Sequence, residues 1–150
     1  MTHLISSVSK VEAASDQLDW AIRLFLDHKA YVPAITLSHA AETILGDSVA
    51  HAGGKSALFR IADNLSGATG HTPEKVRQFM NDPANWLKHW KGRADSEKLD
   101  LELETLSIQY ITRAAINLHQ HDQTLVSEMP RFWEWIKHHR PDIDPERGKE

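Results

Sequence analysis

Residues 31–51 read YVPAITLSHAAETILGDSVAH, and this stretch is the centre of the predicted fold. Pro33 stands where the first turn of a helix tolerates proline. Apolar or small residues recur behind it at helical spacing, namely Ala34, Leu37, Ala41, Ile44, Leu45 and Val49. The many small side chains favour close packing on other helices. We therefore predict one long central helix over residues 31–51.

Two polar residues, His39 and Glu42, are three positions apart and so share one face of this helix. One hypothesis is a metal site of a hydrolase, completed by His28, His89 or His119 from neighbouring helices. The di-iron pattern of helical bundles has Glu before His and occurs twice, whereas this chain has the reverse order once. The alternative is a partly buried Glu42 that pairs with a cation or with His39 and links helices. We predict no bound metal and no cofactor.

The preceding segment, residues 7–28, has an amphipathic helical pattern. Its core-facing positions are Val11, Ala14, Leu18, Ala21, Ile22 and Phe25. Trp20 and Leu24 widen the apolar arc, which indicates a second packing surface and suggests a homodimer. The junction at residues 29–30 is short, so the first two helices are predicted to form a long antiparallel hairpin.

Further helices are predicted over residues 55–65, 73–80, 84–91, 105–119 and 130–139, with Asp82 and Pro83 as a break. Residues 98–104 read KLDLELE, a strict alternation that fits either an extended arm or the overlap with the next helix. The expected fold is all-α, a bundle of about five to seven helices. Residues 1–140 are expected to form a single domain and residues 141–150 a polar tail.

Composition narrows the classes of protein that fit. The chain has 150 residues, of which 41% are hydrophobic and 25% charged, as in one ordinary globular domain. No apolar run approaches the roughly 20 residues that span a bilayer, so we expect a cytoplasmic protein that makes no membrane contact. The lack of Cys excludes disulfides and thiolate chemistry. A formal charge of −4 argues against a general polyanion-binding surface, so any nucleic-acid contact should be local.

Residues 83–93, PANWLKHWKGR, are the most unusual segment of the chain. On a helix, Asn85 and His89 would form one edge and Trp86 and Trp90 the next. The cations beside these edges are Lys88, Lys91 and Arg93. Aromatic faces among cations suit the bases and phosphates of single-stranded nucleic acid. The alternative is that both Trp side chains pack in the core and the cations are solvated.

The order of these elements resembles an uncharacterised bacterial family of HEPN-like helical proteins. The resemblance covers about residues 16–136 and rests on three features: the hairpin with AITLSHAAETILG, the segment NWLKHW, and the final FWEWI helix. It implies a helical bundle that commonly dimerises. Many members of the wider superfamily are metal-independent RNases or toxins that use an Arg, a polar residue and a His.

Carried onto this chain, the polar residue and the His of that pattern fall on Asn85 and His89, and the Arg position holds Ala84. A methyl group cannot stabilise phosphorane charge as a guanidinium does. Arg113 and His119 show a similar spacing within another helix, where the neighbouring residues do not match. The resemblance therefore implies a fold and a nucleotide contact more than it implies catalysis.

Three functions follow as expectations. The first is a binding module that contacts nucleotide or RNA through Asn85, Lys88, His89 and Arg93, with Trp86 and Trp90 beside them and His39 and Glu42 in support. The second is a metal-independent endoribonuclease in which His89 is the general base and Asn85 orients it. The third is a metal-dependent hydrolase that uses the His39 and Glu42 face.

Overall fold

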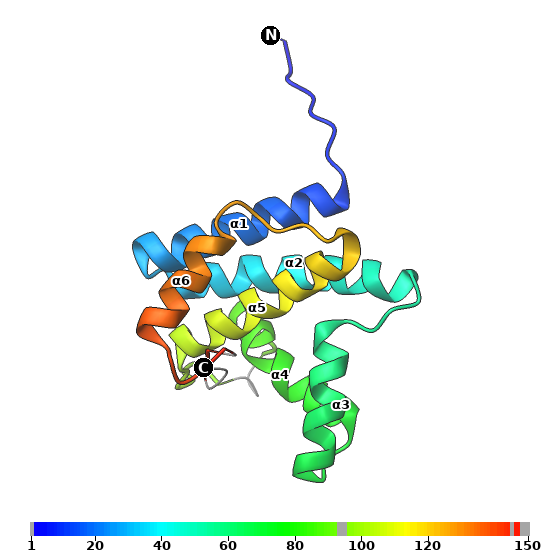
Figure 1. Cartoon of the computed structure of the whole chain (residues 1–150), viewed down its shortest axis with the longest axis vertical. Coiled ribbons are helices and arrows are strands. Elements are labelled where there is room, and N and C mark those ends of the chain that lie inside the picture. Colours follow the sequence, from blue (N-terminus) through cyan, green and yellow to red (C-terminus); the bar gives the residue numbers. More distant parts are fainter. Residues whose placement is uncertain (1, 93–95, 145, 148–150) are drawn as a thin grey trace.

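The computed structural model describes residues 2–92, 96–144 and 146–147. Within these residues the chain forms helices and no strand, which confirms the all-α prediction (Figure 1). Six helices follow one another, α1 Lys10–His28, α2 Tyr31–His51, α3 Ala57–Thr69, α4 Pro73–Lys88, α5 Leu103–Asp122 and α6 Met129–His139. None of them is long and apolar enough to cross a membrane.

The predicted hairpin of α1 and α2 is present, and α2 has the predicted bounds. Ser9 caps α1 through a capping box, in which its hydroxyl accepts from the Glu12 N–H and the Glu12 carboxylate accepts from the Ser9 N–H. The turn into α2 passes through Lys29, whose φ of 50° lies in the left-handed region. The first helix therefore begins at Lys10 and not at the predicted residue 7, because the Ser9 cap fixes its start.

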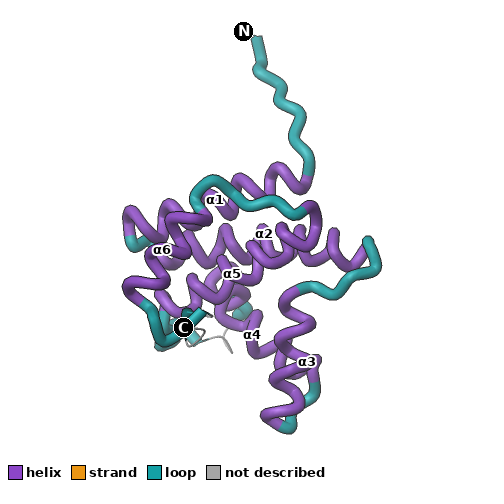
Figure 2. The backbone as a smooth tube through the Cα atoms, viewed as in Figure 1, coloured by secondary structure: helices purple, strands orange, loops and turns teal. Residues whose placement is uncertain are grey.

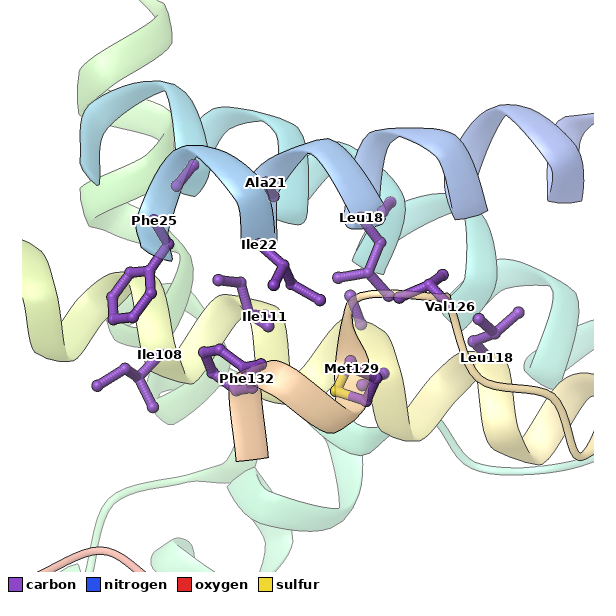
Figure 3. Packing of buried hydrophobic residues seen from close by; sticks show 14 of the residues in the cluster. Leu18, Ala21, Ile22, Phe25, Ile108, Ile111, Leu118, Val126, Met129 and Phe132 are labelled. Carbon is purple, nitrogen blue, oxygen red and sulfur yellow. The ribbon is translucent and has the colours of Figure 1, made fainter. Parts of the chain in front are cut away.

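The main core lies among α1, α2, α5 and α6. In Figure 3, Leu18, Ile22 and Phe25 of α1 point toward Ile108 and Ile111 of α5. Phe132 and Met129 of α6 fill the same space from the side, and Val126 precedes them. All of these side chains are buried, so the apolar stripe of each helix is covered within the chain.

Helices α3 and α4 lie to one side of this bundle and pack mainly on each other (Figures 1 and 2). Asn117 of α5 holds the beginning of α3, because its Oδ1 accepts from the Ala57 N–H at 2.8 Å. Its Nδ2 donates to the Glu42 carbonyl of α2 at 3.2 Å. This one buried amide therefore fixes the position of α3 relative to both central helices.

The predicted break at Asp82 and Pro83 is wrong, because α4 continues through Pro83. A proline inside a helix disturbs the backbone hydrogen bonds of the adjoining turn. Here the Tyr110 hydroxyl of α5 enters that turn, donating to the Met80 carbonyl at 2.7 Å and accepting from the Ala84 N–H at 3.3 Å. A residue distant in sequence thus joins the two segments predicted as separate helices.

Three other predicted boundaries differ. Helix α3 continues through Gly67 to Thr69, and Gly70, with φ of 73°, ends it. Residues 98–102 are not helical and residues 103–104 open α5, so the alternation in KLDLELE belongs to a connection and a helix start. Helix α5 extends to Asp122, beyond the predicted residue 119. The last helix lies within one residue of its predicted bounds.

Candidate functional site

A cleft of about 550 Å³ lies between α2, the loop before α3, and the middle of α4. One side of α2 forms its longest wall, because residues at positions 39, 43, 46, 47 and 50 share a helical face. The residues that line it are His39, Glu42, Thr43, Gly46, Asp47, Ala50, Gly53, Gly54, Lys55, Ser56, Leu58, Phe59, Asn81 and Asn117. The volume lies within the range of small-molecule sites in proteins.

A buried ion pair stands at the wall of this cleft. Arg113 Nε lies 2.7 Å from Glu42 Oε1, and Arg113 Nη2 donates to Glu42 Oε2 at 3.0 Å. Both side chains are almost fully buried, and the guanidinium also lies over the Tyr110 ring. Burial raises the pKa of Glu42, and the charge of Arg113 opposes that shift. The prediction that Glu42 pairs with a cation and links helices is confirmed, with Arg113 as the cation.

His39, one turn before Glu42, is 7% exposed and meets Lys88 of α4. The Lys88 Nζ and the His39 Nδ1 are 2.9 Å apart. Burial lowers the pKa of His39 to about 4, helped by the charges of Lys88 and Arg113 and opposed by the Asn81 side chain. The ring is therefore neutral at pH 7, so Nδ1 accepts from the Lys88 ammonium group and Nε2 carries the proton.

Arg77, Asn81 and Lys88 share one face of α4, at positions i, i+4 and i+11, and Asn81 of this face lines the cleft. The Arg77 guanidinium lies 4.2 Å from the centroid of the Phe59 ring, which is 44% exposed. Asn81 lines the cleft, and its side chain hydrogen-bonds His39, which favours the protonated ring. Lys88 is the residue that contacts His39. Phe59 and Asn81 thus line the cleft, and the cations Arg77 and Lys88 contact lining residues at its edge.

Charge is divided unevenly along the chain. Residues 53–92, which include α3 and α4, hold six Lys or Arg and three Asp or Glu, a formal net of +3. The whole chain has −4, which leaves −7 for the rest. The cleft therefore opens beside a basic region of an acidic chain. This distribution fits a local contact with a polyanion.

The residues predicted from the segment 83–93 are not brought together as a helical edge. Helix α4 ends at Lys88, and His89 is an extended C-cap with φ of −130°. Trp90 follows the helix and is 72% exposed, whereas Trp86 is half-buried and donates from Nε1 to the Ser96 carbonyl at 3.0 Å. The predicted pairing of Asn85 with His89 and of Trp86 with Trp90 on a continuous helix is therefore wrong, because α4 ends at Lys88.

The remaining predicted residues have different surroundings. Arg93 lies outside the described residues. Ala84, at the position that the resemblance gives to an Arg, is fully buried against Tyr110 and Ile35. Arg113 is buried and paired, while His119 is exposed. In the described ranges no group of three or more His, Asp or Glu side chains is arranged to hold a metal ion.

Several residues in the cleft or beside it were missed by sequence reasoning. Arg77, Phe59 and Asn81 belong to helices whose patterns look ordinary, and Asn117 lies within the apolar run of α5. One signal was available in α5, where two polar residues occupy the face of the helix that is buried. Arg113 and Asn117 are four positions apart on the face that carries Tyr110 and Ala114. No family model matches the chain, and comparison with curated proteins and with solved structures gives no match.

Proposed function

We propose that this chain is a binding module that contacts a nucleotide or single-stranded RNA through the cleft between α2, α3 and α4, without catalysing a reaction. One observation carries the proposal. Phe59 and Asn81 line one cleft, and two cations contact lining residues at its edge, Arg77 over the Phe59 ring and Lys88 beside His39. Bases stack on aromatic and guanidinium planes, and phosphates pair with cations.

The state of His39 supports a binding role for Lys88. A neutral imidazole accepts a hydrogen bond from the ammonium group without cancelling its charge. Lys88 is otherwise exposed, so its remaining donors face solvent beside the cleft. The long side chain is thereby held in place before a ligand arrives, which lowers the entropy cost of binding a phosphate.

The same contacts support binding rather than turnover. A histidine whose pKa is about 4 is a weak general base at neutral pH. Arg113 is engaged by Glu42, so its charge is not presented to a substrate. His89 lies beyond the end of α4 and is exposed. The resemblance to HEPN-like proteins points in the same direction, because the Arg position of the catalytic pattern holds Ala84.

Fluorescence anisotropy with a labelled mixed-sequence RNA tests the proposal. We expect salt-sensitive binding that weakens roughly tenfold in Arg77→Gln and in Lys88→Gln, since each removes a phosphate contact. Lys75→Gln is the matched control, because Lys75 lies on the opposite side of α4 and is exposed. Equal affinities for wild type and all three variants would refute the proposed site.

The same RNA, incubated with chelator and separated on a gel, tests the absence of catalysis. We expect full-length RNA in every lane. Chelator-resistant products that disappear in His89→Ala would overturn the non-catalytic proposal in favour of the endoribonuclease.

We also propose that two copies associate through α1. Trp20 is 49% exposed on the side of α1 that does not face the core, and this supports a second apolar contact. Light scattering on the purified protein should give the mass of a dimer, and Trp20→Glu should reduce it to that of a monomer. A monomeric wild type contradicts the proposal.

A further inference from the structure

We infer that the cleft holds a terminal phosphate group at the start of α3, between the Ser56 hydroxyl and the backbone N–H groups of Leu58 and Phe59. This inference deepens the proposed function and rests on it, because it names the part of a nucleotide or RNA that this end of the cleft receives. Phe59 also carries the ring that lies under Arg77, so the phosphate and the base would occupy adjoining parts of the cleft. The inference follows from three hydrogen-bond donors that the fold leaves without acceptors.

The first observation concerns the backbone at the start of α3. A helix leaves its first N–H groups without partners inside the helix. The Ala57 N–H donates to Asn117 Oδ1 at 2.8 Å. The next two, of Leu58 and Phe59, have no acceptor within the described residues, since the side chain of the capping Ser56 does not bind them. Both residues line the cleft, so this turn offers two free donors beside it.

The second observation concerns the Ser56 side chain. Ser56 lines the cleft and is only 8% exposed, and its hydroxyl has no hydrogen-bond partner in the part of the chain that the structure describes. A serine at this position usually accepts from an N–H group of the first turn, and here it does not. A Cβ added at Gly46 would lie 3.3 Å from the Ser56 Cβ, so the side chain is held close against α2. A buried hydroxyl without a partner is costly, and a ligand oxygen would remove that cost.

An anion with several oxygens fits these donors better than a neutral group does. The N-terminus of a helix carries partial positive charge and attracts phosphate. The first turn of α3 contains no Asp or Glu that would compensate this charge. A phosphomonoester offers three terminal oxygens, one for each donor, and a charge of about −1.5 to −2 at pH 7. An internal phosphodiester offers two such oxygens and a single charge, so the site favours a terminal phosphate.

The charged side chains in this part of the cleft are compatible with an anion. Lys55 pairs with Asp63, but the two side chains are 58% and 36% exposed, so the pair is weak and Lys55 can turn to a phosphate. Two carboxylates line the cleft from α2. Glu42 is neutralised by Arg113, and Asp47 is exposed to solvent, which screens its charge.

Isothermal titration calorimetry on the full chain gives the first test, with AMP, the methyl ester of AMP and adenosine. These ligands share one base and differ in the charge and the free oxygens of the phosphate. We expect AMP to bind roughly tenfold more tightly than either of the others. In nitrogen-15 NMR spectra, AMP and inorganic phosphate should shift the amide signals of Leu58 and Phe59, and adenosine should leave them in place.

Ser56→Asp gives the second test, because it places a carboxylate on the same donors. Aspartate is a good capping residue, so thermal stability should stay the same or rise while AMP binding weakens at least roughly tenfold. A purely structural role of Ser56 would not separate the two readouts in this way. Asn64→Asp is the control, because it adds the same charge to α3 at an exposed position that does not line the cleft. Ser56→Ala, which removes only the hydroxyl, is the milder second variant and should weaken AMP severalfold.

The outcomes separate this inference from the proposed function. Equal affinity for AMP, its methyl ester and adenosine would overturn the inference. AMP binding that is weakened by Arg77→Gln but by neither Ser56 variant would also overturn it and leave the proposed function standing. Absence of both AMP and RNA binding would overturn the two together.

Discussion

The bundle of α1, α2, α5 and α6 and the pair α3 and α4 are held in place by different kinds of contact. Helix α5 buries nine of its 20 residues, whereas α3 and α4 bury two each over 13 and 16 residues. The pair is joined to the bundle by polar contacts, among them Asn117 with Ala57 and Tyr110 with the turn at Pro83, and by one small apolar cluster in which Ala84 packs on Ile35 and Tyr110. The comparison indicates that stability resides mainly in the apolar bundle, and that the smaller pair presents surface for contact.

The largest effect on stability is expected at the buried ion pair of Arg113 and Glu42 inside the bundle. Arg113→Met leaves the Glu42 carboxylate buried without its partner, which should lower the free energy of unfolding by about 3–5 kcal/mol. Urea denaturation followed by circular dichroism measures this change. The double variant Glu42→Leu with Arg113→Met is the control, and it should recover most of the loss. A single variant as stable as wild type would show that the pair does not anchor α5 to α2.

The second prediction concerns pH. The pKa of His39 is lowered from 6.5 to about 4 in the folded chain, so the unfolded chain binds more protons between these values. Stability from this group is therefore complete above pH 6.5 and is lost as pH falls toward 4, by at most about 3 kcal/mol. Burial of Glu42 acts with the opposite sign, because it raises the pKa of a carboxyl group.

The difference between wild type and His39→Asn isolates this contribution. Urea denaturation at several pH values between 7 and 4 should show a smaller advantage for wild type as the solution becomes more acidic. A constant difference across this range would mean that His39 is not held neutral. It would also contradict the proposal that a neutral His39 ring accepts a hydrogen bond from Lys88 and holds it in place.

A smaller effect is expected at the junction of the two regions. Tyr110→Phe removes the hydroxyl that satisfies the Ala84 N–H and the Met80 carbonyl, at a cost of about 1–3 kcal/mol. Amide hydrogen exchange should quicken in α4 around Pro83 and remain slow in α1. Phe132→Leu, inside the apolar core, is the comparison variant and should instead affect the whole bundle. Unchanged exchange in α4 would contradict the bridging role of Tyr110.

The smallest effect should come from the exposed surface of α4. Phe79 is 77% exposed, so Phe79→Ser should change the free energy of unfolding by no more than about 0.5 kcal/mol. Thermal unfolding checks this, with Phe25→Ser of the buried core as the destabilised control. A large loss in Phe79→Ser would show that α4 depends on apolar contacts that the comparison assigns to the bundle.

The apolar period of the sequence was enough to predict α2, the hairpin and α6, because their boundaries are set locally by a cap, a short junction and a proline near the start of a helix. The course of α4 was not predictable in this way. Pro83 signals a break, and only the distant Tyr110 hydroxyl explains why the helix continues. Local signals cannot register a hydrogen bond to a residue that lies 30 positions away.

The candidate site was predicted at its α2 wall, from His39 and Glu42, and at Lys88 of α4. Their partners, Lys88 and Arg113, come from other helices, and their pairing depends on how those helices pack. The segment around Asn85 and His89 was predicted as a site because Trp and Lys residues are concentrated there. The cleft is instead lined by residues that belong to no unusual sequence pattern, such as Asn81 and Phe59.

The uneven charge along the chain has a consequence for how the molecule meets a partner. With +3 on residues 53–92 and −7 on the rest, charge of opposite sign is concentrated in different parts of the chain despite its modest net charge. In the field of a polyanion such a molecule turns before contact, so that α3 and α4 face the polyanion and the acidic bundle points away from it. The approach is thereby aligned in solution, and added salt weakens that alignment through screening.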